Sequence, residues 1–250
     1  MDALLRVTDL RKTFGSLAAV NDVSFEVSEG GVFGIAGPNG AGKTTLFNAI
    51  TGIPFRADSG TIEFGGRRVE GLPARDLCRL GIARTFQQDV AFDSLSVADN
   101  VRLAAVFGAG DRRTSVDEEV DRALDFVGLS DDHATLAGML RLDARKRLML
   151  ASALATKPRL LMLDEPAAGL HGQELVRLHD LILKIKAAGV TILMIEHVLP
   201  VLFGLSGRVM IMDAGRPIAE GAPAHVVKND DVIDAYLGQA GRRAFHSARG

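Results

Sequence analysis

The chain is organised around residues 32–46, where a short apolar run leads into a glycine-rich turn and then into a helix expected to open at Thr44. The turn fits the pattern G-x-x-x-x-G-K-[ST], in which backbone N–H groups and a helix N-terminus surround phosphate groups. A glycine-rich turn without a ligand is the alternative, but the motif is complete and lies between a strand and a helix. The sequence therefore predicts a nucleoside triphosphate site made of Gly37, Pro38, Asn39, Gly40, Ala41, Gly42, Lys43, Thr44 and Thr45.

The residues of this loop have different expected roles. The glycines allow a tight turn that aims several N–H groups inward. Lys43 is expected to contact the outer phosphates, and Thr44 is expected to supply a hydroxyl ligand to Mg²⁺.

A second motif follows four consecutive apolar residues at 160–163, which fit a strand buried on both faces. Asp164 and Glu165 lie at the carboxyl end of this strand, the end at which α/β sheets bind ligands. We expect Asp164 to orient the hydration shell of Mg²⁺ and Glu165 to polarise an attacking water. The alternative is an acidic pair that caps the helix expected at 173–188.

Two single residues have less specific signals. His197 follows another buried strand, at 190–195, so it can donate to a γ-phosphate, although a histidine at a strand end is usually a surface residue. Phe14 precedes the phosphate loop and could stack on an adenine, although a lone phenylalanine is more often in a core. The other five histidines show no metal-ligand spacing.

Composition limits the classes of protein that the chain can represent. Its 250 residues suffice for one large α/β domain with a smaller subdomain, and a net charge of −2 does not suggest nucleic acid or acidic lipid as a partner. The single cysteine, Cys78, excludes an internal disulfide and a thiol cluster for zinc. No apolar run approaches the roughly 18–20 residues that cross a bilayer, and the N-terminus lacks a signal-peptide pattern, so we expect any membrane role to come through a partner.

The remaining patterns predict the fold class: an α/β P-loop NTPase core with an N-terminal antiparallel β layer and an inserted α-helical subdomain. Alternating segments at 4–7 and 23–27 indicate the β layer, and a hairpin is expected over 208–221. Helical periodicity runs from 96 to about 154. We expect a single domain over 1–240, with its core at 1–87 and 156–240, expected helices at 97–107, 116–127 and 142–154 within a helical subdomain at 88–155, and a flexible tail at 241–250.

These motifs together resemble the nucleotide-binding subunit of an ATP-binding cassette (ABC) transporter, over essentially the whole chain. Residues 37–45 match the Walker A motif of that family and 160–165 match its Walker B motif. The resemblance implies that Glu165 is the catalytic glutamate, that His197 is the switch histidine, and that Phe14 stacks on the adenine. It also implies that Gln87 is the Q-loop glutamine, a ligand of Mg²⁺ that relays changes to membrane subunits.

Within the family, the chain looks like the branched-chain amino acid import group, through segments 81–88, 164–170, 195–197, 217–221 and 235–238. That resemblance implies ATP and Mg²⁺ as cofactors and a place on the cytoplasmic face of the inner membrane. The implied partners are integral-membrane permease subunits, a second ATPase subunit or a second copy of the chain, and indirectly a solute-binding protein, with no nucleic acid.

One element departs sharply from the family. Its signature motif, Leu-Ser-Gly-Gly-Gln, contacts a γ-phosphate held by the other subunit of an ATP-sandwich dimer, and here that position holds a degenerate sequence. Loss of the serine hydroxyl and of both glycines should weaken that contact, and Asp143 should repel phosphate while Arg141 could bind it. An alternative register places 136–139 in this role, and the D-loop carries His171 where many relatives have Asp or Asn. The degenerate signature consists of Leu140, Arg141, Leu142, Asp143 and Ala144.

We therefore expect an ATPase that powers an importer for branched-chain or related amino acids, with Glu165 directing water at the γ-phosphate. Two alternatives remain: an ATP-binding regulatory or structural subunit with little hydrolysis of its own, and a soluble cassette protein of DNA repair or translation. A P-loop kinase is possible in principle, but the acidic pair with His197 fits hydrolysis better. The transported substrate is not encoded in this chain.

Overall fold

A computed structural model describes residues 3–87, 90–108 and 115–236. The chain divides into two compact units, Met1–Gly71 with Leu193–Gly250 and Leu72–Ile192, so that the boundary falls within the fully buried strand β8 (Thr191–Ile195). Gln88, in the segment at 81–88, and the expected tail at 241–250 lie outside the described residues. The division into a nucleotide-binding core and a helical subdomain at 88–155 stays a prediction.

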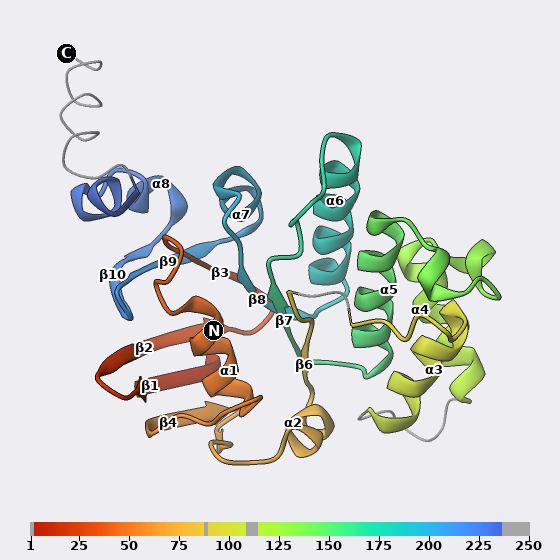
Figure 1. The fold of residues 1–250 in the computed structure, drawn as a ribbon, viewed down its shortest axis with the longest axis horizontal. Helices are drawn as coiled ribbons and strands as arrows, with labels where there is room; N and C mark the ends of the chain where they lie inside the picture. The colour runs from red at the N-terminus through yellow and green to blue at the C-terminus, as the bar shows by residue number, and fades with distance from the viewer. Residues whose placement is uncertain (1–2, 88–89, 109–114, 237–250) are drawn as a thin grey trace. The chain divides into compact units, whose positions relative to one another are not determined.

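The first unit contains the predicted antiparallel layer, a four-stranded sheet in the order β2-β1-β4-β5 (Figure 1). Val7 of β1 lies opposite Phe25 of β2 on one side and Ile62 of β4 on the other. Every second residue near the end of β2 is buried, because successive side chains of a strand point to opposite faces. The strands are β1 (Ala3–Phe14), β2 (Leu17–Ser28), β4 (Ser59–Phe64) and β5 (Arg67–Arg68).

The same unit contains a second group of strands that leads into the phosphate loop. The five residues of β3 (Val32–Ala36) are all buried, and β3 pairs in parallel with β9 (Arg208–Asp213). Strand β10 (Arg216–Gly221) pairs antiparallel with β9, which confirms the predicted hairpin. The same unit contains the helices α1 (Lys43–Thr51), α7 (Leu199–Leu205) and α8 (Pro223–Val226).

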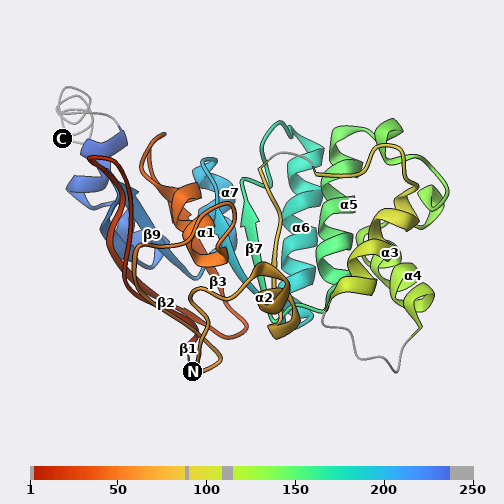
Figure 2. The same cartoon turned by 60° about the horizontal axis from the view of Figure 1, so that its bottom comes forward.

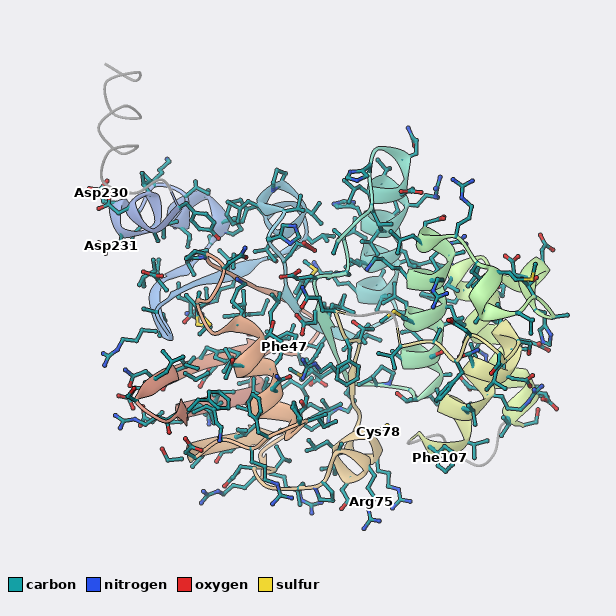
Figure 3. The ribbon with its side chains drawn as sticks, viewed as in Figure 1. Phe47, Arg75, Cys78, Phe107, Asp230 and Asp231 are labelled. Carbon is teal, nitrogen blue, oxygen red and sulfur yellow. The ribbon has the colours of Figure 1, made fainter. Side chains whose placement is uncertain are left out.

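Helix α1 is anchored by its apolar side. Phe47 is completely buried, and Figure 3 shows it within the first unit. Leu46, also fully buried, precedes it in the chain. Burial of these two side chains holds the N-terminus of the helix, and therefore the loop before it, in a fixed place.

The second unit is built on two parallel strands, β6 (Ile82–Arg84) and β7 (Leu160–Asp164), whose register places Arg84 opposite Met162. Helix α2 (Ala74–Leu80) precedes β6 and ends at Gly81, whose positive φ of 101° provides its C-cap. Helix α6 (Gln173–Ala187) follows β7 and buries one apolar side.

Three further helices of this unit match the predicted helical segments within one residue. They are α3 (Val97–Phe107), α4 (Val116–Val127) and α5 (Leu142–Ala155), with 3₁₀ turns η1 (Ser130–Asp132) and η2 (Ala137–Met139) between the last two. Ser96 caps α3, and Ser115 forms a reciprocal capping box with Glu118 at the start of α4. Figures 1 and 2 show α3, α4, α5 and α6 side by side.

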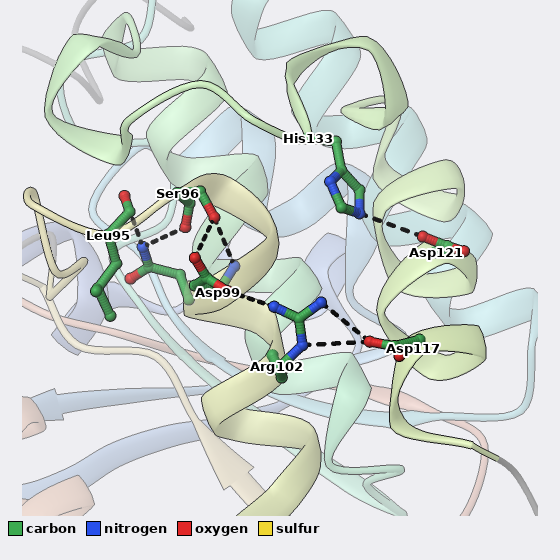
Figure 4. A network of polar contacts seen from close by, with 8 residues as sticks. Leu95, Ser96, Asp99, Arg102, Asp117, Asp121 and His133 are labelled. Atoms are coloured by element: carbon green, nitrogen blue, oxygen red, sulfur yellow. Dashed lines mark hydrogen bonds and ion pairs between the residues drawn. The ribbon is translucent and has the colours of Figure 1, made fainter.

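Polar contacts link the surfaces of α3 and α4 (Figure 4). Arg102 contacts Asp99 on its own helix, and its Nη2 lies 3.0 Å from Asp117 of α4. His133 Nε2 lies 3.4 Å from Asp121. These side chains are well exposed, so each contact contributes little to stability. Across the described ranges of the chain, no helix combines the length and apolar character that crossing a membrane requires.

Candidate functional site

The loop between β3 and α1 has the backbone that the phosphate-loop pattern predicts. Gly37 and Gly42 have φ angles of 150° and 95°. A Cβ atom on Gly37 would lie 2.1 Å from the carbonyl oxygen of Met212, and one on Gly42 would lie 2.0 Å from that of Ala19. Both glycines are therefore required by close backbone approach as well as by conformation.

Lys43 closes this loop. Its Nζ donates hydrogen bonds to the carbonyl oxygens of Gly37, at 2.8 Å, and Pro38, at 3.0 Å. The lysine side chain is buried, while Thr44 and Thr45 are half-buried. Because Gly42 provides no side-chain cap for α1, the N–H groups of the first helical turn combine with the lysine ammonium to favour an anion.

Phe14 lies at the end of β1 with its side chain 46% exposed, so it is not a core residue. Its ring meets the ring of Phe55 edge to face, with centroids 5.0 Å apart. Phe55 was not identified from the sequence, since no local pattern connects it with a residue 41 positions earlier, and only its place in the loop after α1 brings it near β1.

His197, in the same unit, follows the end of β8 and has a half-exposed side chain. The preceding Glu196 is fully buried and accepts hydrogen bonds from the backbone N–H of His197, at 3.1 Å, and of Val198, at 3.4 Å. The Nδ1 atom of His197 lies 3.4 Å from the same carboxylate oxygen. Glu196 therefore orients the backbone that carries the histidine, a role that the sequence alone did not indicate.

The acidic pair belongs to the second unit, and Asp164 occupies the last position of β7. Nη2 of Arg84, at the end of β6, donates to Oδ2 of Asp164 at 2.9 Å. The guanidinium also lies over the ring of Phe86, at 4.9 Å from its centroid. Burial lowers the pKa of Arg84, and the hydrogen bond and charge of Asp164 oppose that shift. Arg84 was not identified from the sequence, although it is the only charged residue of its strand.

Glu165 lies in the left-handed region, with a φ of 49°. For a residue other than glycine this conformation costs on the order of 1–3 kcal/mol and tends to occur at functional sites. Gln87 donates from Nε2 to Oε2 of Glu165 at 2.9 Å. The segment at 84–87 therefore contacts both members of the acidic pair, which brings together three of the predicted site residues.

The degenerate signature forms the start of α5, whose N-cap is Arg141. Oδ2 of Asp143 lies 3.6 Å from Arg147 on the same helix and 3.5 Å from Arg177 on α6. The negative charge at this position is thus compensated within the unit, which reduces the repulsion expected from the sequence. The residues of the alternative register lie in and beside η2.

The donor types suit Mg²⁺, because a carboxylate at Asp164 and a hydroxyl at Thr44 are the hard oxygen ligands that it prefers. In the part of the chain that the structure describes, no group of three or more His, Cys, Asp and Glu side chains could hold a metal by itself. A cation bound with phosphate oxygens as further ligands needs only one or two protein ligands.

Comparisons with known protein families and with characterised proteins identify relatives of this chain. The family model described as "ABC transporter" matches residues 20–168, and the model described as "Branched-chain amino acid ATP-binding cassette transporter" matches residues 216–241. The chain is 38% identical, over 95% of its length and 98% of the relative, to the high-affinity branched-chain amino acid transport ATP-binding protein LivG of Salmonella typhimurium. It is also 38% identical, with the same coverage, to the corresponding protein BraF of Pseudomonas aeruginosa.

A solved structure shows the same fold. It is the ADP conformation of an ATP-binding cassette of an ABC transporter, which superimposes with a TM-score of 0.86 and 30% sequence identity. The match covers 96% of this chain and all of that chain. The predicted fold class is thus confirmed.

Proposed function

The chain belongs to the ABC transporter family, and we propose that it binds and hydrolyses ATP to drive the import of branched-chain or related amino acids. The observation that carries the ATP assignment is the loop at 37–45, in which glycines hold the backbone and Lys43 lies at an uncapped helix N-terminus. The names of the relatives from Salmonella typhimurium and Pseudomonas aeruginosa support the importer and its cargo class.

Each site residue then has a role in the reaction. Lys43 and the first N–H groups of α1 bind the outer phosphates, and Phe14 stacks on the base. Thr44, Asp164 and Gln87 hold Mg²⁺, which supplies charge neutralisation on the phosphate oxygens when it is bound. Glu165 accepts a proton from the attacking water, and His197 donates to the γ-phosphate. These roles follow from the family resemblance and from the chemistry of the side chains.

The chain acts in a dimer with permease subunits on the cytoplasmic face of the inner membrane, and a solute-binding protein acts indirectly. Its degenerate signature at 140–144 lacks the hydroxyl and the glycines that contact a γ-phosphate across a dimer. A homodimer would contain two impaired sites, whereas a heterodimer with a second ATPase would contain one. We therefore propose that a second ATPase subunit is the partner.

The degenerate signature at 140–144 also favours a second candidate function, that of a subunit that binds ATP but hydrolyses little of it. Retention of Glu165 and His197 argues against it, because a binding-only subunit needs neither a general base nor a γ-phosphate donor. Hydrolysis therefore remains the first proposal.

The decisive experiment measures ATP turnover by the purified chain beside Glu165→Gln, with ATP-dependent dimerisation followed by light scattering. Asp125→Asn, an exposed carboxylate on α4, serves as the matched control. We expect Glu165→Gln to bind ATP and to lose turnover by about 10²–10⁴-fold, while Asp125→Asn retains it. Measurable turnover that is equal in the chain and in Glu165→Gln would refute hydrolysis at this site. Binding without turnover by the chain alone would favour the second candidate unless a partner ATPase restores hydrolysis.

A further inference from the structure

The ring of Phe14 is held by residues from a different part of the chain. Phe55, in the loop that follows α1, presents its ring edge to face against Phe14, at 5.0 Å between centroids. Such pairs are favourable beyond simple burial, because the positive edge of one ring meets the negative face of the other. Since Phe14 is nearly half exposed at the end of its strand, this contact restricts a ring that would otherwise turn freely.

A partly buried cation, Lys12, accompanies the two rings. The Nζ atom of Lys12 lies 5.4 Å from the centroid of the Phe14 ring and 5.5 Å from that of Phe55. Both distances are within the range of a cation–π attraction. The Lys12 side chain is only 14% exposed, which strengthens this attraction because little water competes for the ammonium.

Asp58 fixes the lysine and the strand end together. Its Oδ1 accepts a hydrogen bond from Lys12 Nζ at 2.6 Å. Its Oδ2 accepts from both the backbone N–H and the hydroxyl of Thr13, each at 2.7 Å. Its own backbone N–H donates to the carbonyl oxygen of Arg11 at 2.8 Å. The hydrogen bonds from Lys12 and from Thr13 lower the pKa of Asp58 to about 2, so the carboxylate stays charged at any physiological pH.

We propose that Phe55 and Lys12 are positioning residues for base recognition, which hold the Phe14 ring in the orientation that stacks on the adenine of ATP. Asp58 completes this support by fixing Lys12 and Thr13. The inference rests on the proposed function, in which Phe14 contacts the base. Pre-ordering a ring reduces the entropy lost on binding, so the support should raise affinity for nucleotides that carry a base.

The test compares ATP with inorganic triphosphate, a probe that contains the phosphate chain but no base. Binding of both, in the presence of Mg²⁺, is measured for the full chain and for Phe14→Ala, Phe55→Leu and Lys12→Met. Arg67→Met, which removes an exposed cation from β5 of the same unit, is the control for Lys12→Met. Phe55→Tyr keeps an aromatic ring and tests whether the ring itself is required.

We expect Phe55→Leu and Lys12→Met to weaken ATP binding about three- to tenfold, with triphosphate binding changed less than about twofold. Phe55→Tyr and Arg67→Met should bind ATP as the unaltered chain does. In turnover assays with the partner ATPase present, KM for ATP should rise at unchanged kcat, because the support contributes to binding and not to the chemical step.

Three results would overturn the inference. A parallel loss of ATP and triphosphate binding in Phe55→Leu and Lys12→Met would indicate a merely structural role. Unchanged ATP binding in both, with Phe14→Ala weakened, would show that Phe14 needs no support while the proposed function stands. If Phe14→Ala also binds ATP normally, base stacking in the proposed function fails, and the inference fails with it.

Discussion

Arg84 donates from Nη2 to Oδ2 of Asp164 at 2.9 Å, and the two side chains are only 6% and 1% exposed. Both groups therefore lie in an environment where an isolated charge is very unfavourable. Such a buried pair adds little net stability compared with apolar residues, but loss of one member removes a charged partner of the other. Arg84 thus allows a carboxylate to be kept at the buried end of β7.

The substitution Arg84→Met should lower the free energy of unfolding by about 3–5 kcal/mol, because it removes a charged partner of a buried carboxylate. Denaturant unfolding of the purified chain measures this change. The double variant Arg84→Met/Asp164→Asn should lose less free energy of unfolding than the sum of the losses in the two single variants. The reason is that Asp164→Asn removes the carboxylate charge that Arg84→Met alone would leave buried.

Arg79→Met is the matched control for this experiment. Arg79 lies on α2 with its side chain 68% exposed, and it approaches Asp76 only to 3.9 Å. We expect a change within about 0.5 kcal/mol. Equal losses for Arg79→Met and Arg84→Met would contradict the importance of the buried pair.

Alanine at Gly42 and Gly40 should have different effects. At Gly42 the new Cβ would lie 2.0 Å from a backbone oxygen, so the loop must shift, whereas at Gly40 nothing lies within 4 Å. Both positions have positive φ, so both substitutions introduce about 1 kcal/mol of backbone strain. Gly42→Ala should additionally weaken ATP binding by more than tenfold and lower the melting temperature well below that of Gly40→Ala. Similar binding by the two variants would show that the close contact at Ala19 does not control the loop.

Tyr236 offers a direct pH measurement, since it is the only tyrosine and the chain has no tryptophan. Burial raises its pKa, and a backbone hydrogen bond at Gly37 partly offsets the shift. The neutral phenol is favoured in the folded chain. The contribution of the Tyr236 phenol to the free energy of unfolding is therefore complete below its ordinary pKa of about 10. It is lost as the pH rises through the raised pKa of the folded chain.

Ultraviolet absorbance of the phenolate should consequently appear at higher pH in the folded chain than in the chain unfolded by denaturant. Tyr236→Phe removes the signal and provides the blank. Coincident titration curves for the folded and unfolded chain would refute burial of this hydroxyl.

Much of the fold was predictable because its signals are local. The helices at 97–107 and 116–127 combine helical periodicity with serine caps at Ser96 and Ser115, so their bounds agreed with the structure. The phosphate loop is likewise a continuous segment, and its glycine positions follow directly from the motif. The pairing of Arg84 with Asp164 could not be predicted, because the two residues are separated by 80 positions in the chain. Only the parallel register of β6 with β7 brings them together.

The signature region shows the same limit. The sequence revealed which residues replace the family motif, but the partners of Asp143 come from one turn later in α5 and from α6. The effect of Asp143 on phosphate binding therefore depends on α6, a helix that begins 30 residues after Asp143 in the chain. Side-chain pairing between helices leaves no periodic signal in a single sequence.

A repaired signature is therefore expected to gain activity and to lose stability. Arg141→Ser/Leu142→Gly/Asp143→Gly restores the hydroxyl and glycines, so turnover by a homodimer should rise at least severalfold if γ-phosphate contact limits it. The same variant loses the contacts of Asp143 with Arg147 and Arg177 and gains glycines in the first turn of α5, which should lower its melting temperature. Paired turnover and thermal unfolding measurements separate the two effects. Turnover no faster than that of the unaltered homodimer would contradict the proposed impairment.

The two hydrogen bonds from Lys43 to carbonyl oxygens of its own loop have a thermodynamic consequence. Because the ammonium group of Lys43 already has partners inside the loop, the loop keeps its conformation before any phosphate binds. Little conformational entropy is therefore lost on binding. Capture of a nucleotide is then an exchange of hydrogen-bond acceptors, carbonyl for phosphate, and its release is the reverse exchange. A site that returns to the same closed arrangement after each turnover is ready for the next nucleotide without refolding its walls.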